Sequence, residues 1–297
     1  MKYKILLWGT GTDYNKNYNG LKYFEITKQL EIIGITADKV PNVKKIDGYR
    51  IIDKINIKNI EFDYVVVMSS KYFFEIKEIL NSMNIEDDRI LSLKFIFIPH
   101  LNLENYIFLK KSNISIISNN CWGGIVYKTL GFECRSPFKN LFLEDIDYLK
   151  LLRNFSYYMR LEPVFKRNEK DFHSGIMYPV LELGDIEIHC NHAQNEKEAI
   201  NDWKRRREKI NYNSLCVEMY ATKRESVKQF CELKQYSNKI CFTPYKYGYN
   251  EEIQLELMPG QREFWEAVNS SAGIGRNSYI YNVVDLLCQK YESRIVY

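Results

Sequence analysis

The residues best suited to carry out chemistry lie in two short segments of the second half of this 297-residue chain. In the first segment, Cys121 follows the apolar run 114–117 and precedes Trp122, Gly123 and Gly124. A cysteine at the start of a helix lies near the positive end of the helix dipole, which favours the nucleophilic thiolate. The two glycines indicate a constrained turn or the close approach of a ligand. The alternative interpretation is a small buried cysteine packed beside a tryptophan.

The second segment, His-Cys-Asn-His at residues 189–192, could supply a base. Three of the four histidines of the chain lie within residues 173–192. Strand alternation places His189 on the same face as Glu187, and a two-residue turn would set Glu187 opposite Glu182. Imidazole and carboxyl groups gathered in this way could perform acid–base catalysis. The solvated face of a hairpin would explain the same pattern.

The same histidines could instead bind a metal ion together with a cysteine. Adjacent side chains of a strand point to opposite faces, however, and zinc sites generally use wider ligand spacings. We therefore predict no metal site at His173, His189, Cys190 or His192.

A helix is predicted over residues 196–210, with Ala199 and Trp203 on its inward face at helical spacing. Arg206 and Arg207 fall on that same side. An inward guanidinium requires an anionic partner, which could be a carboxylate of this chain or a phosphate of a bound substrate. The sequence leaves both alternatives open.

A glycine turn follows the first apolar run of the chain. Gly9 and Gly11 would let the backbone approach a phosphate held at the next helix N-terminus. Asp38 ends the second run, near the place where an acid meets ribose hydroxyls. Ser69 and Ser70 end the third run, where open parallel sheets bind ligands. These residues form a candidate cofactor-binding site, although ordinary strand-end turns would give the same pattern.

The elements that must position these residues follow from the hydrophobic pattern. Apolar runs alternate with amphipathic stretches in the first third, as in a parallel sheet with right-handed crossovers. A polar loop is expected over residues 12–19, and a domain boundary is placed after residue 105. The predicted strands of this first domain are 4–8, 31–37, 64–68 and 90–98, and its predicted helices are 20–30 and 71–83.

The second domain, residues 106–297, mixes both kinds of element. Its predicted strands are 114–117, 178–183, 186–190, 215–220 and 239–242, and its predicted helices are 196–210, 225–236 and 278–292. The fold class is therefore α/β, with a parallel-sheet domain over residues 1–105 followed by a larger mixed α/β domain.

Composition excludes several classes of protein. A hydrophobic fraction of 45% and a charged fraction of 27% are typical of a folded globular chain, and no apolar run approaches the roughly 18 residues of a membrane span. A net charge of +4 without a long basic stripe argues against a nucleic-acid-binding protein. Seven scattered cysteines argue against a disulfide framework and fit a reducing compartment. We predict a cytoplasmic protein, and its oligomeric state is left open.

The first third of the chain resembles a small Rossmann-like domain that occurs in bacterial enzymes of surface-sugar modification. The resemblance implies a nucleotide or nucleotide-sugar site in this domain. It is carried by the runs Lys4–Gly11, Ile32–Ile35, Ile46–Ile51 and Asp63–Ser70.

The second domain resembles a bacterial family of unknown function whose members are often labelled exopolysaccharide-biosynthesis proteins. The resemblance implies a role around surface-glycan assembly, and it brings no assigned catalytic residues. Its motifs are Ser118–Gly124, Ser136–Phe142, Asp147–Lys150, Gly184–Ala193 and Asp202-Trp203.

Our leading hypothesis is an enzyme of surface-polysaccharide biosynthesis that performs group transfer on a sugar, nucleotide-sugar or glycan precursor. The cofactor is undetermined apart from a nucleotide or nucleotide-sugar. The alternative is a non-catalytic module that binds a nucleotide-sugar and acts as a scaffold in a glycan-assembly complex. A polar cleft shared by the thiol and the imidazoles would favour the enzyme. The predicted catalytic residues are Cys121, His189 and His192, and the predicted substrate-binding residues are Asn119, Asn120, Trp122, Gly123, Gly124, Asn191, Arg206 and Arg207.

Overall fold

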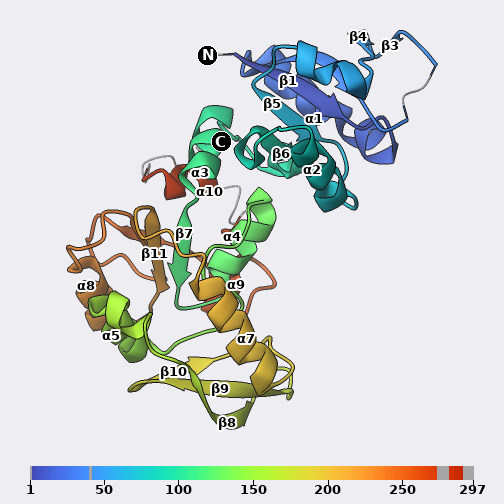
Figure 1. The fold of residues 1–297 in the computed structure, drawn as a ribbon. Helices are drawn as coiled ribbons and strands as arrows, with labels where there is room; N and C mark the ends of the chain where they lie inside the picture. The colour runs from blue at the N-terminus through green and yellow to red at the C-terminus, as the bar shows by residue number, and fades with distance from the viewer. Residues whose placement is uncertain (1, 40–41, 273–280, 290–297) are drawn as a thin grey trace. The chain divides into compact units, whose positions relative to one another are not determined.

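A computed structural model describes residues 2–39, 42–272 and 281–289 of the chain (Figure 1). The chain divides into two compact units, Met1–Lys111 and Ser112–Tyr297. The boundary predicted after residue 105 falls inside helix α3 (Leu103–Ser112). Lys110 and Lys111 lie in the last turn of that helix, where lysines complement the helix dipole.

The first unit is built on a four-stranded parallel sheet in the order β2-β1-β5-β6. Both central strands are apolar, with β5 buried throughout and β1 buried from Ile5 onward, as expected for strands covered on both faces. The strand order reverses between them, which is where parallel α/β sheets form a crevice at their carboxyl ends. The strands are β1 (Tyr3–Trp8), β2 (Leu30–Thr36), β5 (Tyr64–Val67) and β6 (Ile90–Ser92).

Two sequence predictions for this unit are wrong. Residues 12–19 are not a loop, because helix α1 begins at Thr12, directly after the glycine turn. Its first two turns are polar, and Tyr14 is their one buried residue, so the helical period is weak there. The predicted strand 90–98 ends at Ser92, whose side chain accepts the N–H of Lys94 and starts a 3-10 helix.

The remaining elements of the first unit connect and cover the sheet. The helices are α1 (Thr12–Ile26), α2 (Phe73–Ser82) and the 3-10 helices Lys54–Asn59, Asp87–Arg89 and Leu93–Phe97, and a short hairpin is formed by β3 (Lys45–Ile46) and β4 (Tyr49–Arg50).

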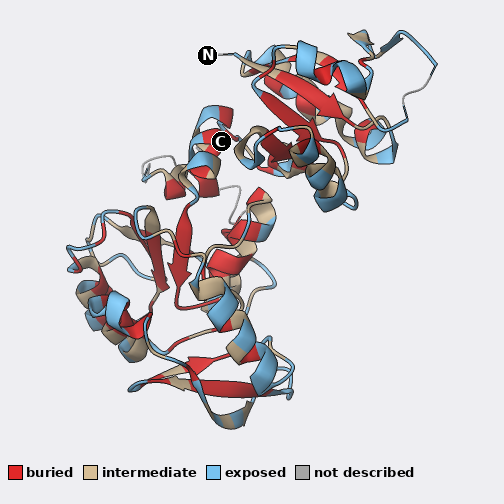
Figure 2. Cartoon of the chain, viewed as in Figure 1, coloured by how far each residue is buried: buried red, intermediate tan, exposed pale blue. Residues whose placement is uncertain are grey.

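The second unit contains another four-stranded parallel sheet, in the order β13-β12-β11-β7. Figure 2 shows how deeply these strands are buried; β7 and β12 are buried along their whole length. Because the strands are parallel, their carboxyl ends meet at one edge of the sheet. The strands are β7 (Ser115–Ser118), β11 (Leu215–Tyr220), β12 (Lys239–Thr243) and β13 (Glu252–Gln254).

Helices cover both faces of this sheet (Figure 1). On one face, α5 and α8 pack together over a core that includes Ile117, Val217 and Met219. On the other face, α4 packs beside α9, and Trp122 lies 5.5 Å from the ring of Phe242. The helices are α4 (Trp122–Leu130), α5 (Asp145–Arg153), α6 (Phe155–Tyr158), α7 (Glu196–Arg207), α8 (Arg224–Cys231), α9 (Phe264–Ser270) and α10 (Val283–Leu287). Of the predicted helix 278–292, residues 278–280 and 290–292 lie outside the described residues.

A smaller antiparallel sheet completes the second unit. Its strands are β8 (Val164–Lys170), β9 (Met177–Leu183) and β10 (Ile186–His189), in the order β10-β9-β8. The predicted hairpin is confirmed, with Glu187 opposite Glu182 in its register. Helix α7 packs against β9.

The α/β class predicted from the alternating pattern is confirmed by the two parallel sheets and their helices. Within the three described ranges, no helix is both long enough and apolar enough to cross a membrane.

Candidate functional site

Cys121 occupies the start of the helix that follows the edge strand β7. It is the N-cap residue of α4, and its Sγ lies 3.3 Å from Nε2 of His192, 71 positions further along the chain. Cys121 is half-buried and His192 is exposed, so a small molecule can reach the pair. A thiol within hydrogen-bonding distance of an imidazole is the arrangement that nucleophilic catalysis by cysteine requires.

The two residues meet because one loop binds both of the segments that carry them. Phe142 pairs with His189 through two backbone hydrogen bonds of 3.0 Å each, in an isolated antiparallel bridge. The next residue, Leu143, donates its N–H to the carbonyl of Asn119 at 3.0 Å. The loop therefore holds the end of β10 against the turn that follows β7.

The asparagines of that turn have partners inside the fold. The side chain of Asn119 exchanges hydrogen bonds with both backbone groups of Tyr220, at 3.0 and 3.1 Å. Asn120 accepts the N–H of Trp122 at 2.7 Å, and its Nδ2 lies 3.0 Å from each carboxyl oxygen of Glu218. Both asparagines are buried. This arrangement corrects the expectation that they bind substrate hydroxyls, since their amides fix the shape of the turn.

Glu218 is the residue of this site that the sequence interpretation missed. It lies in β11 opposite Ser118 of β7 and is 0% exposed. Burial raises the pKa of its carboxyl group to about 8, although the hydrogen bond from Asn120 opposes the shift. The group therefore holds a proton in most molecules at neutral pH. Its signal in the sequence is a single acid within the apolar strand 215–220, because glutamate is rarely buried without a partner.

The thiol of Cys121 is not the thiolate that its place at a helix start predicts. Burial and the nearby carboxyl group of Glu218 raise its pKa to about 11, so the expectation of a lowered thiol pKa is wrong. Desolvation and a neighbouring acid outweigh the helix dipole here. The thiol proton must leave during any attack, and the imidazole of His192 is placed to receive it.

His189, the other predicted base, lies in a different environment. Its ring stacks on Phe142 at 4.4 Å between centroids, and its Nδ1 lies 3.1 Å from Oε2 of Glu169. Burial lowers the pKa of this imidazole despite that carboxylate. The ring packs within the antiparallel sheet, and the catalytic role of His189 stays a prediction.

The carboxylates on this sheet form ion pairs instead of an acid–base pair. The ammonium of Lys166 lies 3.5 Å from Glu182 and 2.8 Å from Glu187, and Arg167 pairs with Glu187 at 2.7 Å. Arg167 and Lys166 lower the pKa of Glu187 to about 2. The repulsion expected between two opposed carboxylates is therefore relieved by cations. Asn191, predicted to bind substrate, is half-buried beyond this sheet.

The residues that follow Cys121 are explained by helix packing. Trp122 is 0% exposed. A Cβ at Gly123 would lie 2.6 Å from Oγ of Ser118, and one at Gly124 would lie 2.8 Å from Oδ1 of Asn140. The indole is out of reach of a ligand, and both glycines are needed because α4 lies so close to its neighbours. These contacts give all three residues a packing role, and their predicted binding roles stay predictions.

Replacing Trp122 with phenylalanine is expected to lower the free energy of unfolding by about 1–3 kcal/mol. The variant loses the hydrogen bond from the indole N–H to Oγ of Ser271, which measures 3.0 Å, and leaves a small cavity beside Phe242. Urea denaturation measures the change. The matched control is Trp265→Phe on the exposed side of α9, with an expected change below about 0.5 kcal/mol. Unchanged stability in Trp122→Phe would contradict the packing role.

The arginines of α7 are paired with carboxylates of this chain. Arg206 pairs with Asp202 and donates to the carbonyl of Lys139 at 3.2 Å. Arg207 pairs with Glu162 at 2.7 Å. Of the two alternatives left open by the sequence, the internal carboxylate is the one observed. That these arginines also bind a substrate phosphate stays a prediction.

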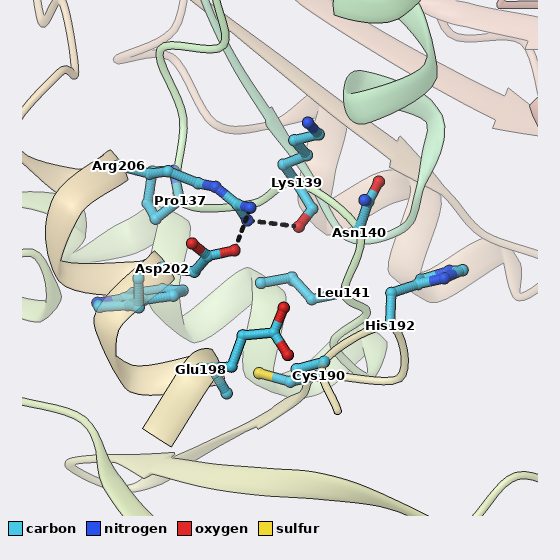
Figure 3. Close-up of a pocket in the computed structure, with 12 residues that line it drawn as sticks. Pro137, Lys139, Asn140, Leu141, Cys190, His192, Glu198, Asp202 and Arg206 are labelled. Carbon is cyan, nitrogen blue, oxygen red and sulfur yellow. Dashed lines mark hydrogen bonds and ion pairs between the residues drawn. The ribbon is translucent and has the colours of Figure 1, made fainter. Parts of the chain in front are cut away.

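A pocket of about 110 Å³ is lined in part by His192 (Figure 3). It is lined by the loop 137–141, by the segment after β10 and by residues of α7. His192 belongs to this lining, and Figure 3 shows its imidazole turned away from the other labelled residues. The same imidazole contacts Cys121, so His192 is shared by the pocket and the thiol.

In the first unit, the predicted cofactor residues gather where the two central strands end. Gly9 follows β1 with a φ of +121°, a conformation that favours glycine, and Gly11 precedes α1. Ser69 and Ser70 follow β5, and the N–H of Ser70 donates to the carboxylate of Asp13 at 2.9 Å. That carboxylate lies in the first turn of α1, and the hydrogen bond connects this turn to the end of β5.

Asp38, the predicted ribose ligand, pairs with Lys54 at 2.8 Å between Nζ and Oδ1. Both side chains are more than 40% exposed, and exposed ion pairs contribute little to stability. The carboxylate of Asp38 can therefore exchange Lys54 for a hydroxyl group of a ligand.

The three histidines of the second unit do not converge on one point. His189 contacts Glu169, His192 contacts Cys121, and His173 lies 6.1 Å from Trp265 between ring centroids. Over the part of the chain that the structure describes, no three His, Cys, Asp or Glu side chains come together as a metal site.

The fold and the site define an α/β protein of two units, with a cysteine–histidine contact at the carboxyl end of a parallel sheet. The chain belongs to the family described as Domain of unknown function (DUF1919), whose model matches residues 92–287. Residues 1–91 match the model described as C2185-like, N-terminal.

A protein of Haemophilus influenzae, described as an uncharacterized protein, is similar to this chain. The two are 32% identical over 176 residues, which cover 58% of this chain and 82% of the relative. The matches confirm that the second domain resembles a family of unknown function. The surface-glycan role and the Rossmann-like character of the first domain stay predictions.

Proposed function

We propose that the protein is a group-transfer enzyme that acts on a sugar or glycan precursor in surface-polysaccharide biosynthesis. Cys121 is the nucleophile and His192 is the base. The single observation that carries the catalytic part is the 3.3 Å contact between Cys121 Sγ and His192 Nε2, at a position open to solvent. The substrate class rests on the motif resemblances in both parts of the chain.

The contact suits transfer of an acyl group in two balanced steps. In the first, Nε2 of His192 takes the thiol proton while Sγ of Cys121 bonds to the acyl carbon, and the leaving group of the donor departs with that proton. In the second, an acceptor hydroxyl attacks the thioester. His192 takes the hydroxyl proton, the S–C bond breaks, and the proton returns to the sulfur. Each step requires the imidazole because the pKa of the thiol is about 11.

The test uses p-nitrophenyl acetate as a general acyl donor. Attack by Cys121 releases p-nitrophenolate and leaves an acetyl thioester, which peptide mass spectrometry can locate. We expect the label on Cys121 and no label there in Cys121→Ala. Cys134 is also half-buried and serves as an internal reference. Labelling of Cys134 at the same rate would contradict a specifically activated thiol.

A second function is favoured by a separate observation in the first unit. The strand order reverses between β1 and β5, and the glycine turn and Ser69 lie at the carboxyl ends of these strands. We propose that this edge binds a nucleotide or nucleotide-sugar. The whole chain would then act as a non-catalytic binding module if Cys121 proves inert.

A nucleotide-sugar is expected to raise the melting temperature of the full chain with increasing concentration, and Gly11→Val should abolish this shift. A Cβ at Gly11 meets nothing within 4 Å, so the variant should fold normally while its side chain obstructs a phosphate. Asn19→Val, an exposed change on the same helix, should retain the shift. A panel of nucleotide-sugars that produces no shift would rule out the binding edge.

A further inference from the structure

The pocket lined by His192 contains two polar side chains that are open to solvent, the half-buried Asn140 and the exposed Glu198. Among the described residues, neither the side-chain amide of Asn140 nor Oε1 of Glu198 has a hydrogen-bond partner; the other oxygen of Glu198 accepts the N–H of Gln194 at 2.8 Å. Figure 3 shows the Glu198 carboxylate directed toward the centre of the lining residues. A carboxylate oxygen and an amide are suitable partners for hydroxyl groups.

The charges around this pocket are balanced. Arg206 is neutralised by Asp202, and the remaining charged side chains of the lining, Lys139 and Glu198, are of opposite sign. A lining with no excess of cations and a carboxylate at its centre does not favour a phosphate. Leu141 and the other apolar side chains of the lining offer contact to the carbon atoms of a ligand.

We propose that this pocket binds an uncharged, hydroxyl-rich part of a ligand, such as one end of a sugar. A volume of about 110 Å³ is small against the roughly 300–1,000 Å³ of sites for drug-sized ligands, so it accommodates part of a ring and not a nucleotide. The role as acceptor subsite rests on the proposed function. The binding of neutral hydroxyls stands on the pocket alone.

The position of His192 connects the pocket to the chemistry. Its imidazole contacts the thiol of Cys121 while the residue itself lines the pocket. The pocket therefore selects the acceptor by its hydroxyl pattern and leaves the thiol to the donor.

The experiment measures binding of methyl glycosides to the full-length protein by saturation-transfer NMR and calorimetry. These probes carry no transferable group, so binding is observed apart from catalysis. We expect saturable binding that is weakened about tenfold by Glu198→Gln, because a charged acceptor is replaced by a neutral amide that accepts a weaker hydrogen bond. The matched control is Glu196→Gln, an exposed change on the same helix turn. Inorganic phosphate should not displace the glycoside.

Ala193→Trp provides a second variant that fills the pocket directly. With its circular dichroism unchanged, it should abolish glycoside binding. The proposal is overturned if no glycoside binds, if phosphate competes, or if both variants bind as the wild type does. Failure of acetyl labelling at Cys121 with glycoside binding intact would overturn the proposed transfer and leave the pocket assignment standing.

Discussion

Replacing Glu218 with glutamine should make the free energy of unfolding less dependent on pH. The wild type should lose about 1.4 kcal/mol of this free energy per pH unit as the pH rises, and the variant should not. The carboxyl group has an ordinary pKa of 4.5 and a folded-state pKa of about 8, because it is buried. Between these values the folded protein binds more protons than the unfolded chain. The stability contributed by the protonated form is therefore fully present below about pH 4.5 and is lost as the pH rises through about 8.

Glutamine keeps the size of Glu218 and cannot ionise, so it represents the protonated state. We expect the variant to be less pH-dependent than the wild type and more stable than it above about pH 8. Urea unfolding at a series of pH values measures the difference between the two proteins. The exposed Glu256→Gln is the control and should follow the wild type. Parallel curves for Glu218→Gln and the wild type would show that the buried carboxyl group does not titrate in this range.

Titration of Glu218 also affects the thiol of Cys121. Asn120 binds both oxygens of Glu218 and at the same time accepts the N–H of Trp122, so it connects the buried acid to the first turn of α4. Ionisation of Glu218 places a negative charge near Cys121, which further disfavours the thiolate. The protonated form of Glu218 therefore opposes formation of the Cys121 thiolate less than the ionised form does.

The strands of the second unit could be predicted because burial on both faces leaves an apolar run with defined ends. Residues 215–220 were predicted as a strand and form β11 with the same bounds. The register of Glu182 with Glu187 followed from the two-residue turn between their strands. These features depend on local sequence, so the hydrophobic periodicity and the residues of the turn were sufficient to predict them.

The parts of the site that depend on contacts between distant segments could not be predicted. Cys121 and His192 come together through the bridge of Phe142 to His189, and nothing in the local pattern of residues 137–143 marks it. Whether the amides of Asn119 and Asn120 are exposed or buried depends on where β11 lies, and the sequence alone does not give that position. Glu218 carried a signal, an acid in an apolar strand, that was overlooked.

Replacing His192 with glutamine should slow acetylation of Cys121 by p-nitrophenyl acetate by about 10²–10⁴-fold, the usual range for loss of a general base. The thiol has a pKa of about 11, so without the imidazole at 3.3 Å little thiolate forms near neutral pH. The rate of p-nitrophenolate release measures the effect. His173→Gln, in the exposed loop between β8 and β9, is the control and should react as the wild type does.

His189→Gln separates the two candidate bases. Because the ring of His189 stacks on Phe142 and contacts Glu169, its loss should lower stability while the rate at Cys121 in the folded protein changes only a few-fold. Equal loss of rate in His189→Gln and His192→Gln, with both variants folded, would mean that the antiparallel sheet takes part in the reaction. Loss confined to His192→Gln would assign the base to the residue that contacts the thiol.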